Sequence, residues 1–177
     1  MDRSITLEKA SKYIMEDLLY LSKMREGRRK EKFFSTTFIE GLVSDAIDDV
    51  LRENGEKLTK KNRAAFITKD ALNQLNNNNN NNQSNLVIEH IVCKNIYLNE
   101  IKHFLTINKL NPQKIFEILD QYYLTAIVTK SEDQKLDSAG LRTKMVANGS
   151  WDKKDIFSRY TATEIKLIKN PYFIFET

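Results

Sequence analysis

Apolar and polar positions in the first third of the chain follow the three- and four-residue spacing of amphipathic helices. This pattern predicts one helix over Ser4–Lys23, with Ser4 or Thr6 as its N-cap. It predicts a second, more strongly amphipathic helix over Phe34–Leu51, whose apolar residues make one broad face. Asn54-Gly55 then ends or kinks this second helix.

The next segment combines basic residues, a short extended pair and a low-complexity run. We interpret it as a basic turn or short helix, then Phe66-Ile67 as an extended pair, then a short helix with Thr68 as its N-cap that ends near Leu75. Seven consecutive asparagines occupy residues 76–82. Because an uncharged polar run cannot bury apolar area, we expect a linker or loop over residues 76–85.

Beyond the asparagines the pattern changes from helical to mixed. The apolar, β-branched stretches Leu86–Val92 and Tyr122–Thr129 predict two strands that pair with each other. The other expected elements are helices over Ile96–Ile107 and Pro112–Gln121, a capped helix over Ser131–Leu136, a helix over Asp152–Tyr160 and a closing strand over Tyr172–Phe175. This order predicts an α+β fold, with a mainly helical lobe for binding or dimerisation over residues 1–75 and a small mixed lobe of two or three strands over residues 86–177.

Composition and charge exclude several classes of site but do not identify the function. The chain has 28 basic and 24 acidic side chains and a formal net charge of +4, a mixed surface that permits a polyanionic partner but does not require one. The single cysteine, Cys93, excludes an internal disulfide and a multi-cysteine zinc site, and we expect it to be a small buried residue. The five glycines are not clustered, so a phosphate-binding loop of the kinase, ATPase or dehydrogenase type is absent.

The sequence also bears on location. No stretch approaches the roughly 18 consecutive apolar residues of a membrane span, and the first ten residues lack the apolar core of a signal peptide. We therefore expect an intracellular protein, cytoplasmic or associated with a nucleoid or nucleus, without a membrane partner.

The segment Leu86–Lys94 is the strongest candidate for a functional site. Glu89 and His90 stand side by side in an otherwise apolar strand, and polar groups at such positions need either partners or a chemical role. A histidine beside a carboxylate can act as a general base, and basic residues can stabilise negative charge that develops on a phosphorane or another oxyanion. The candidate catalytic residues are therefore Glu89, His90, Lys94, Arg142, Lys144 and Arg159.

The string Ile88-Glu89-His90-Ile91-Val92 resembles the opening of the His-Asn-His type nucleases. In that family an acidic residue and a histidine at a strand end supply a metal ligand and the general base. The resemblance implies that Glu89 would bind a divalent metal such as magnesium and that His90 would be the base. The cofactor stays open, because the histidine and the later basic residues would also suit metal-independent cleavage, which favours RNA with its 2′-hydroxyl nucleophile.

Residues 36–75 resemble the histone fold, in which a long central helix leads through a basic loop and a two-residue bridge into a capped final helix. The resemblance implies that a DNA backbone would be faced by Lys60, Lys61, Arg63 and Thr68. It also implies that a partner chain or second lobe covers the apolar face of the long helix, residues 38–51. A second basic group precedes that helix and adds three candidate nucleic-acid contacts, Arg28, Arg29 and Lys30.

Three functions are compatible with these patterns. We favour a nucleic-acid-acting enzyme, a nuclease with His90 as general base, because Glu89 and His90 are the feature that a purely structural interpretation leaves unexplained. The alternative is a non-enzymatic, histone-like or architectural DNA-binding protein. A homodimer, or a subunit that binds another protein through residues 38–51, would need neither a site nor nucleic acid.

Overall fold

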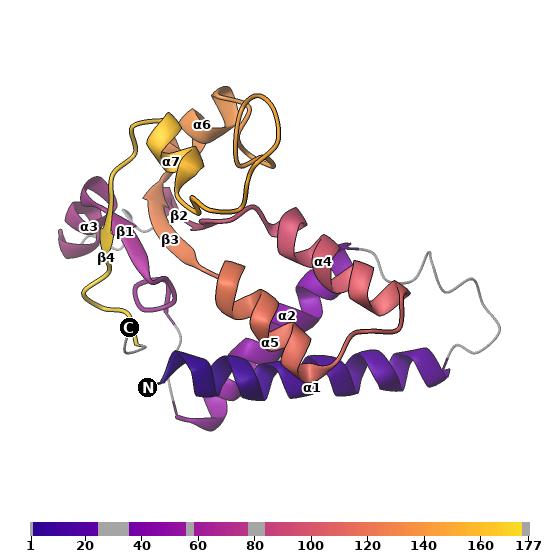
Figure 1. Ribbon diagram of the computed structural model, residues 1–177. Coiled ribbons are helices and arrows are strands. Elements are labelled where there is room, and N and C mark those ends of the chain that lie inside the picture. Colours follow the sequence, from indigo (N-terminus) through magenta and orange to yellow (C-terminus); the bar gives the residue numbers. More distant parts are fainter. Residues whose placement is uncertain (1, 25–35, 56–58, 78–83, 175–177) are drawn as a thin grey trace. The chain divides into compact units, whose positions relative to one another are not determined.

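The computed structural model describes residues 2–24, 36–55, 59–77 and 84–174. They group into two compact units, each built from separate stretches of sequence (Figure 1). A helical unit comprises residues 1–58 and 94–121, and a sheet unit comprises residues 59–93 and 122–176. No described helix combines the length and the hydropathy that a membrane span requires.

The helical unit is built from long amphipathic helices. Its helices are α1 (Arg3–Met24), α2 (Thr36–Glu53), α4 (Lys94–Thr106) and α5 (Pro112–Tyr122). The buried apolar residues of α1 recur every three or four positions and so lie on one face, which packs along α2: Leu7, Ala10, Ile14 and Leu18. The helices predicted for these segments are confirmed.

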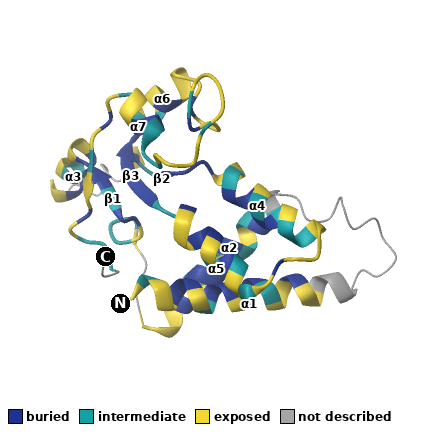
Figure 2. Ribbon diagram, in the orientation of Figure 1, coloured by how far each residue is buried: buried dark blue, intermediate teal, exposed yellow. Residues whose placement is uncertain are grey.

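The apolar face of residues 38–51 is largely buried inside the helical unit (Figure 2). Ile39, Val43, Val50 and Leu51 are each at most 3% exposed, and α2 contacts both α1 and α4. Neighbouring helices of the same chain therefore cover this face, and one of them, α4, comes from the predicted second lobe over residues 86–177.

The described residues of the sheet unit form a four-stranded sheet in the order β2-β3-β1-β4. Its elements are β1 (Phe66–Thr68), α3 (Lys69–Asn76), β2 (Leu86–His90), β3 (Thr125–Thr129), α6 (Lys130–Ser138), α7 (Ser158–Ala162) and β4 (Leu167–Lys169). β3 runs antiparallel to β2 and parallel to β1, and β4 runs antiparallel to β1. The predicted pairing of the two longer strands is confirmed, and so is the α+β fold.

Helices α3 and α6 follow the parallel strands β1 and β3 directly and cover opposite faces of the sheet. Leu75 of α3 packs in a cluster with Ile127, whereas Leu136 of α6 packs in a cluster with Val128. Ile127 and Val128 are neighbours in β3, and successive side chains of a strand point to opposite faces. Each face of the central strand is thereby shielded from water, and all five residues of β3 are buried.

One carboxylate joins the ends of the two parallel strands. Thr68 and Thr129 end β1 and β3 and are the N-caps of α3 and α6, so the predicted capping role of Thr68 is confirmed. Oε2 of Glu132 accepts hydrogen bonds from the backbone N–H of Thr129 (2.8 Å) and from the hydroxyl of Thr68 (2.8 Å). The capping box of α6 therefore extends across to the neighbouring strand.

The helix expected over Asp152–Tyr160 is shorter than predicted and corresponds to α7, which begins at Ser158. The side chain of Asp152 accepts from the backbone N–H of Lys154 (3.0 Å), and that of Asp155 accepts from Phe157 N–H (2.9 Å). These local bonds form turns that compete with a helix.

The closing strand also lies earlier than expected, at β4 instead of Tyr172–Phe175. The chain turns immediately after β4, because Oδ1 of Asn170 accepts from the backbone N–H of Tyr172 (3.1 Å) and its carbonyl accepts from Phe173 (3.1 Å). Phe175 lies outside the described residues.

The two units divide the chain differently from the predicted lobes over residues 1–75 and 86–177. β1 and α3 precede the asparagine run but join the sheet unit, since β1 pairs with β3. α4 follows the run but packs on α2. Of the predicted linker over residues 76–85, the structure describes residues 76–77 and 84–85.

Glu132→Ala should lower the free energy of unfolding by about 1–3 kcal/mol, because the Thr129 N–H and the Thr68 hydroxyl lose their acceptor. Urea denaturation measures the change. Gln134→Ala, at an exposed position of the same helix, is the control and should stay within about 0.5 kcal/mol of wild type. Equal losses for the two variants would contradict the role given to Glu132.

Candidate functional site

Glu89 and His90 lie at the carboxyl end of β2, an edge strand of the sheet. Both are half-buried. In β3, Ala126 lies opposite Glu89 and Thr125 lies opposite His90. Because successive side chains of a strand point to opposite faces, the carboxylate and the imidazole lie on different faces of the sheet and not in one pair.

On one face, Glu89 is paired with Arg159 from α7. Nη2 of the arginine donates to Oε1 of the glutamate, and the two side chains are 1% and 20% exposed. Nη1 donates to Sγ of Cys93 (2.9 Å). A charge removed from water this far requires its partner. The pair explains why an acidic residue stands in an apolar strand, and it leaves Arg159 without access to a substrate in this structure.

Burial and charge together set the protonation of this cluster. Burial raises the pKa of the Cys93 thiol, and the nearby Arg159 charge offsets this only in part. For Arg159, burial lowers the pKa, but its interactions with Cys93, in the alkaline range where that thiol ionises, and with the Glu89 carboxylate outweigh the effect of burial and hold the pKa above its ordinary value. Cys93, 2% exposed, is thus a neutral buried thiol, as the sequence predicted, and Arg159 stays charged.

On the other face, His90 lies against Tyr123 and Thr125. The His90 and Tyr123 ring centroids are 5.5 Å apart with an interplanar angle of 72°, an edge-to-face contact. The hydroxyl of Thr125, the cross-strand neighbour of His90, donates to the backbone carbonyl of Arg63 (3.2 Å). The side chain of Arg63 is exposed. An imidazole, an aromatic ring and the backbone of Arg63 therefore lie at one end of the sheet.

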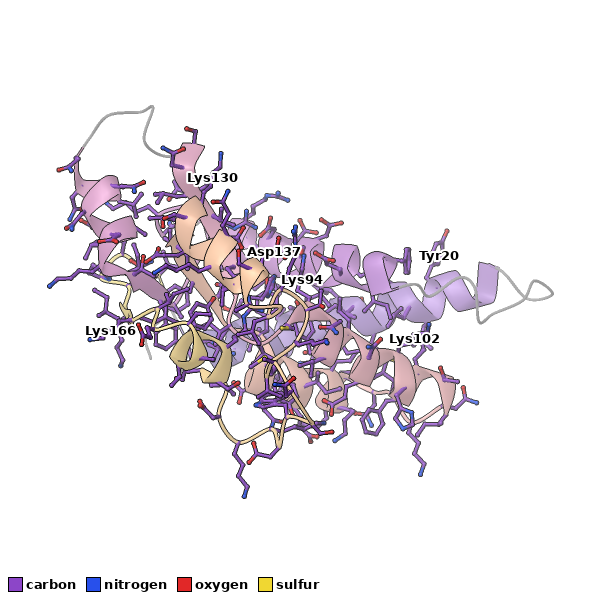
Figure 3. The ribbon with its side chains drawn as sticks, turned by 90° about the horizontal axis from the view of Figure 1, so that it is seen from above. Tyr20, Lys94, Lys102, Lys130, Asp137 and Lys166 are labelled. Atoms are coloured by element: carbon purple, nitrogen blue, oxygen red, sulfur yellow. The ribbon has the colours of Figure 1, made fainter. Side chains whose placement is uncertain are left out.

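The other predicted catalytic residues are placed elsewhere. Lys94, labelled in Figure 3, begins α4 in the helical unit. Its ammonium group pairs with the carboxylate of Glu40. Arg142 is exposed and pairs with Asp137 of α6 at 3.2 Å, and Lys144 is exposed in the loop after α6. Arg63, which the sequence assigned to nucleic-acid binding, is linked to the cross-strand neighbour of His90, because the Thr125 hydroxyl donates to the Arg63 backbone carbonyl.

The remaining predicted nucleic-acid contacts have mixed surroundings. Lys60 donates from Nζ to the carbonyl of Leu86 (2.9 Å). Nζ of Lys61 lies 3.4 Å from the ring centroid of Tyr172, a cation–π contact. Thr68, 1% exposed, does not face solvent, which corrects its expected contact with a DNA backbone. Three further predicted contacts lie outside the described residues: Arg28, Arg29 and Lys30.

The magnesium suggested for Glu89 does not fit its surroundings. Its carboxylate is engaged by the Arg159 guanidinium. Within residues 2–24, 36–55, 59–77 and 84–174, no group of three or more His, Cys, Asp or Glu side chains is placed to hold a metal ion. Glu89 is therefore explained by its ion pair, and no step of the chemistry is derived through a metal bound to it.

Comparison with known proteins leaves the site to be judged on its own geometry. No protein-family model, no curated protein sequence and no solved structure matches the chain. The resemblances to nucleases and to histones therefore stay predictions.

Arg159→Met should lower the free energy of unfolding by roughly 3–5 kcal/mol, because it leaves the Glu89 carboxylate without its partner. Arg142→Met, which breaks an exposed ion pair, should cost at most about 1 kcal/mol. The double variant Glu89→Gln/Arg159→Met should recover much of the loss, since no buried charge remains. Chemical denaturation of the three variants checks this, and a double variant no more stable than Arg159→Met would refute the pairing as the cause.

Tyr160→Phe should match or exceed the wild type in stability, because the Tyr160 hydroxyl is buried and has no hydrogen-bond partner among the described residues. Burial raises the pKa of Tyr160 above its ordinary 10.0, so the hydroxyl ionises more readily in the unfolded chain. Below about pH 10 the hydroxyl is neutral in both states, and its ionisation does not reduce the free energy of unfolding. As the pH rises further towards the folded pKa, ionisation in the unfolded chain lowers that free energy. Thermal unfolding at about pH 7 and about pH 11 should show a smaller alkaline loss for the variant. Tyr20→Phe, at a residue 60% exposed, should behave as wild type.

Proposed function

We propose that this chain acts on nucleic acid as a phosphodiesterase in which His90 is the general base. The observation that supports the proposal most is the strand register, which sets His90 opposite Thr125 and, through the Thr125 hydroxyl, beside the backbone of Arg63. In phosphodiester cleavage a base takes the proton of the attacking hydroxyl or water as the new P–O bond forms, and a cation stabilises the charge on the phosphorane. The P–O bond to the leaving oxygen then breaks, and that oxygen takes a proton from the imidazolium of His90 or from water.

Each residue has a physical role in this proposal. The imidazole of histidine changes its protonation near neutral pH and can take the proton of an attacking hydroxyl or water. Tyr123 limits the orientation of the His90 ring through their edge-to-face contact. The guanidinium of Arg63 would bind a phosphate and stabilise the charge that develops on it.

The buried pair on the opposite face supports the fold around this base. Arg159 and Glu89 join α7 to β2, one residue before His90. We therefore assign Glu89 and Arg159 to holding the strand and not to the reaction. Arg142 and Lys144, exposed beyond α6, carry no role in the proposed step.

His90→Ala should lower the rate of cleavage by about 100-fold or more while leaving the unfolding temperature close to that of wild type, since His90 is only half-buried. The purified protein is incubated with labelled RNA and with labelled DNA, in the presence of magnesium, manganese or a chelator. His103→Ala, at an exposed position of α4, is the matched control and should cleave as wild type does.

Equal cleavage by wild type and His90→Ala would remove His90 as the base. Salt-sensitive binding without cleavage by either protein would overturn the enzyme and leave the architectural, DNA-binding alternative. The chelator arm decides between metal-dependent and metal-independent chemistry, and RNA-specific, chelator-resistant cleavage would indicate attack by the 2′-hydroxyl.

A further inference from the structure

We propose that Asn148 is a site of spontaneous deamidation. The backbone nitrogen of Gly149 attacks the side-chain amide of Asn148, and water then opens the resulting ring to aspartate or isoaspartate. The chain contains a second Asn-Gly pair, Asn54-Gly55, which hydrogen bonds protect from the same reaction. This inference is independent of the proposed function.

The two pairs are alike in the features that govern access to the reacting groups. All four residues are exposed, and the φ angles of the glycines are both positive, 79° at Gly149 and 77° at Gly55. A Cβ added at either glycine would meet no neighbouring atom within 4 Å. Glycine also has no Cβ to hinder its own nitrogen. Access and backbone conformation therefore do not distinguish the pairs.

Hydrogen bonds hold the pair Asn54-Gly55 at the end of α2. Nδ2 of Asn54 donates to the carbonyl of Val50 (2.9 Å), and so does its backbone N–H (3.2 Å). The N–H of Gly55 donates to the carbonyl of Arg52 (2.9 Å). The side-chain amide and the attacking nitrogen are thus both engaged, and these bonds must open before the nitrogen can reach Cγ.

The pair Asn148-Gly149, in the loop between α6 and α7, lacks such bonds. Within the described part of the chain, neither the Asn148 amide nor the Gly149 N–H has a hydrogen-bond partner. The loop is anchored on each side of the pair: the Ser158 hydroxyl donates to the Met145 carbonyl (2.8 Å), and the Trp151 indole N–H donates to a carbonyl within the loop (2.9 Å). The exposed, unbonded span between these anchors can rotate to bring the nitrogen to Cγ.

The reaction balances with water as its only co-reactant. The nitrogen of Gly149 forms a bond to Cγ of Asn148 and loses its proton, the Cγ–Nδ2 bond breaks, and Nδ2 takes a proton and leaves as ammonia. Water then breaks one C–N bond of the succinimide ring. Opening at Cγ gives aspartate, whereas opening at the main-chain carbonyl carbon routes the backbone through the side chain and gives isoaspartate. No atom is oxidised or reduced.

Either product changes the surface of this loop. A neutral amide becomes a carboxylate, which adds a negative charge near the exposed Lys144. Isoaspartate also lengthens the backbone shortly before Trp151, whose ring lies 6.1 Å from that of Tyr122. Because no enzyme is needed, the modified fraction increases with the age of the protein.

The test follows both pairs in the same protein. Purified wild type is kept in mildly alkaline buffer, samples are digested with trypsin at intervals, and mass spectrometry measures the deamidated fraction of the peptide that contains each asparagine. A sample digested at the start corrects for conversion during digestion. Asn148 should convert faster than Asn54 by on the order of tenfold or more, because hydrogen bonds protect Asn54. Equal rates in the native protein would overturn the proposal.

The same measurement in concentrated guanidinium chloride is the control for sequence context. Without the fold, Asn54 and Asn148 should convert at similar rates, since each is followed by glycine. A ratio of rates that is the same in native and unfolded protein would show that neighbouring residues set the difference. That result would overturn the role given to the hydrogen bonds.

Two variants test the site itself. Asn148→Gln should abolish most of the mass change in its peptide, because closure onto the longer side chain requires a six-membered ring; an undiminished change would place the reaction elsewhere. Asn148→Asp, which installs one product, should unfold at the wild-type temperature, since the side chain is exposed. A clear fall in that temperature would show that the fold holds Asn148 and would also overturn the proposal.

Discussion

The parallel pairing of β1 with β3 is the constraint on which the sheet unit depends. A parallel neighbour requires the chain to leave the sheet and return in the same direction, and here the intervening segment supplies β2 as well as helices of the other unit. The pairing also brings the carboxyl ends of β1 and β3 and the N-termini of α3 and α6 to the same end of the sheet. Open α/β sheets commonly bind ligands at this end. In this protein the carboxylate of Glu132 lies at that end of the sheet and accepts the hydrogen bonds of Thr68 and Thr129. The candidate site lies at the other end of the sheet, where β3 begins.

Much of the architecture was predictable from the sequence, because long helices and five-residue strands carry a periodic signal. β1 and β4 have three residues each, too few for periodicity to place their partners. The helix predicted from Asp152 failed for a local reason, since aspartate side chains that accept from nearby backbone N–H groups favour turns as readily as helix starts. The predicted lobe boundary was placed at the asparagine run. The units of the structure depend instead on contacts between residues far apart in sequence, such as the pairing of β1 with β3.

The candidate site was predictable in part. A carboxylate in an apolar strand, such as Glu89, requires a partner, and its partner Arg159 was among the predicted site residues. The alternation of side chains along a strand separates Glu89 from His90 and is readable from the sequence, so assigning both to one site neglected an available rule. The positions of Arg63 and Asn170 depend on the register of β2 against β3 and of β4 against β1, which no local pattern encodes.

The place of Asn170 has a consequence for the order of folding. β4 is the last strand in sequence, yet it pairs with β1, the first, and the loop that carries Arg63 gains its bonds to Asn170 together with that pairing. Contacts between such distant segments form late, because a long stretch of chain must close first. During synthesis α1 and α2 can pack together early. The loop that carries Arg63 lacks its bonds to Asn170 until Asn170 has left the ribosome. The loop that carries Arg63 would therefore become ordered only when the sheet is complete.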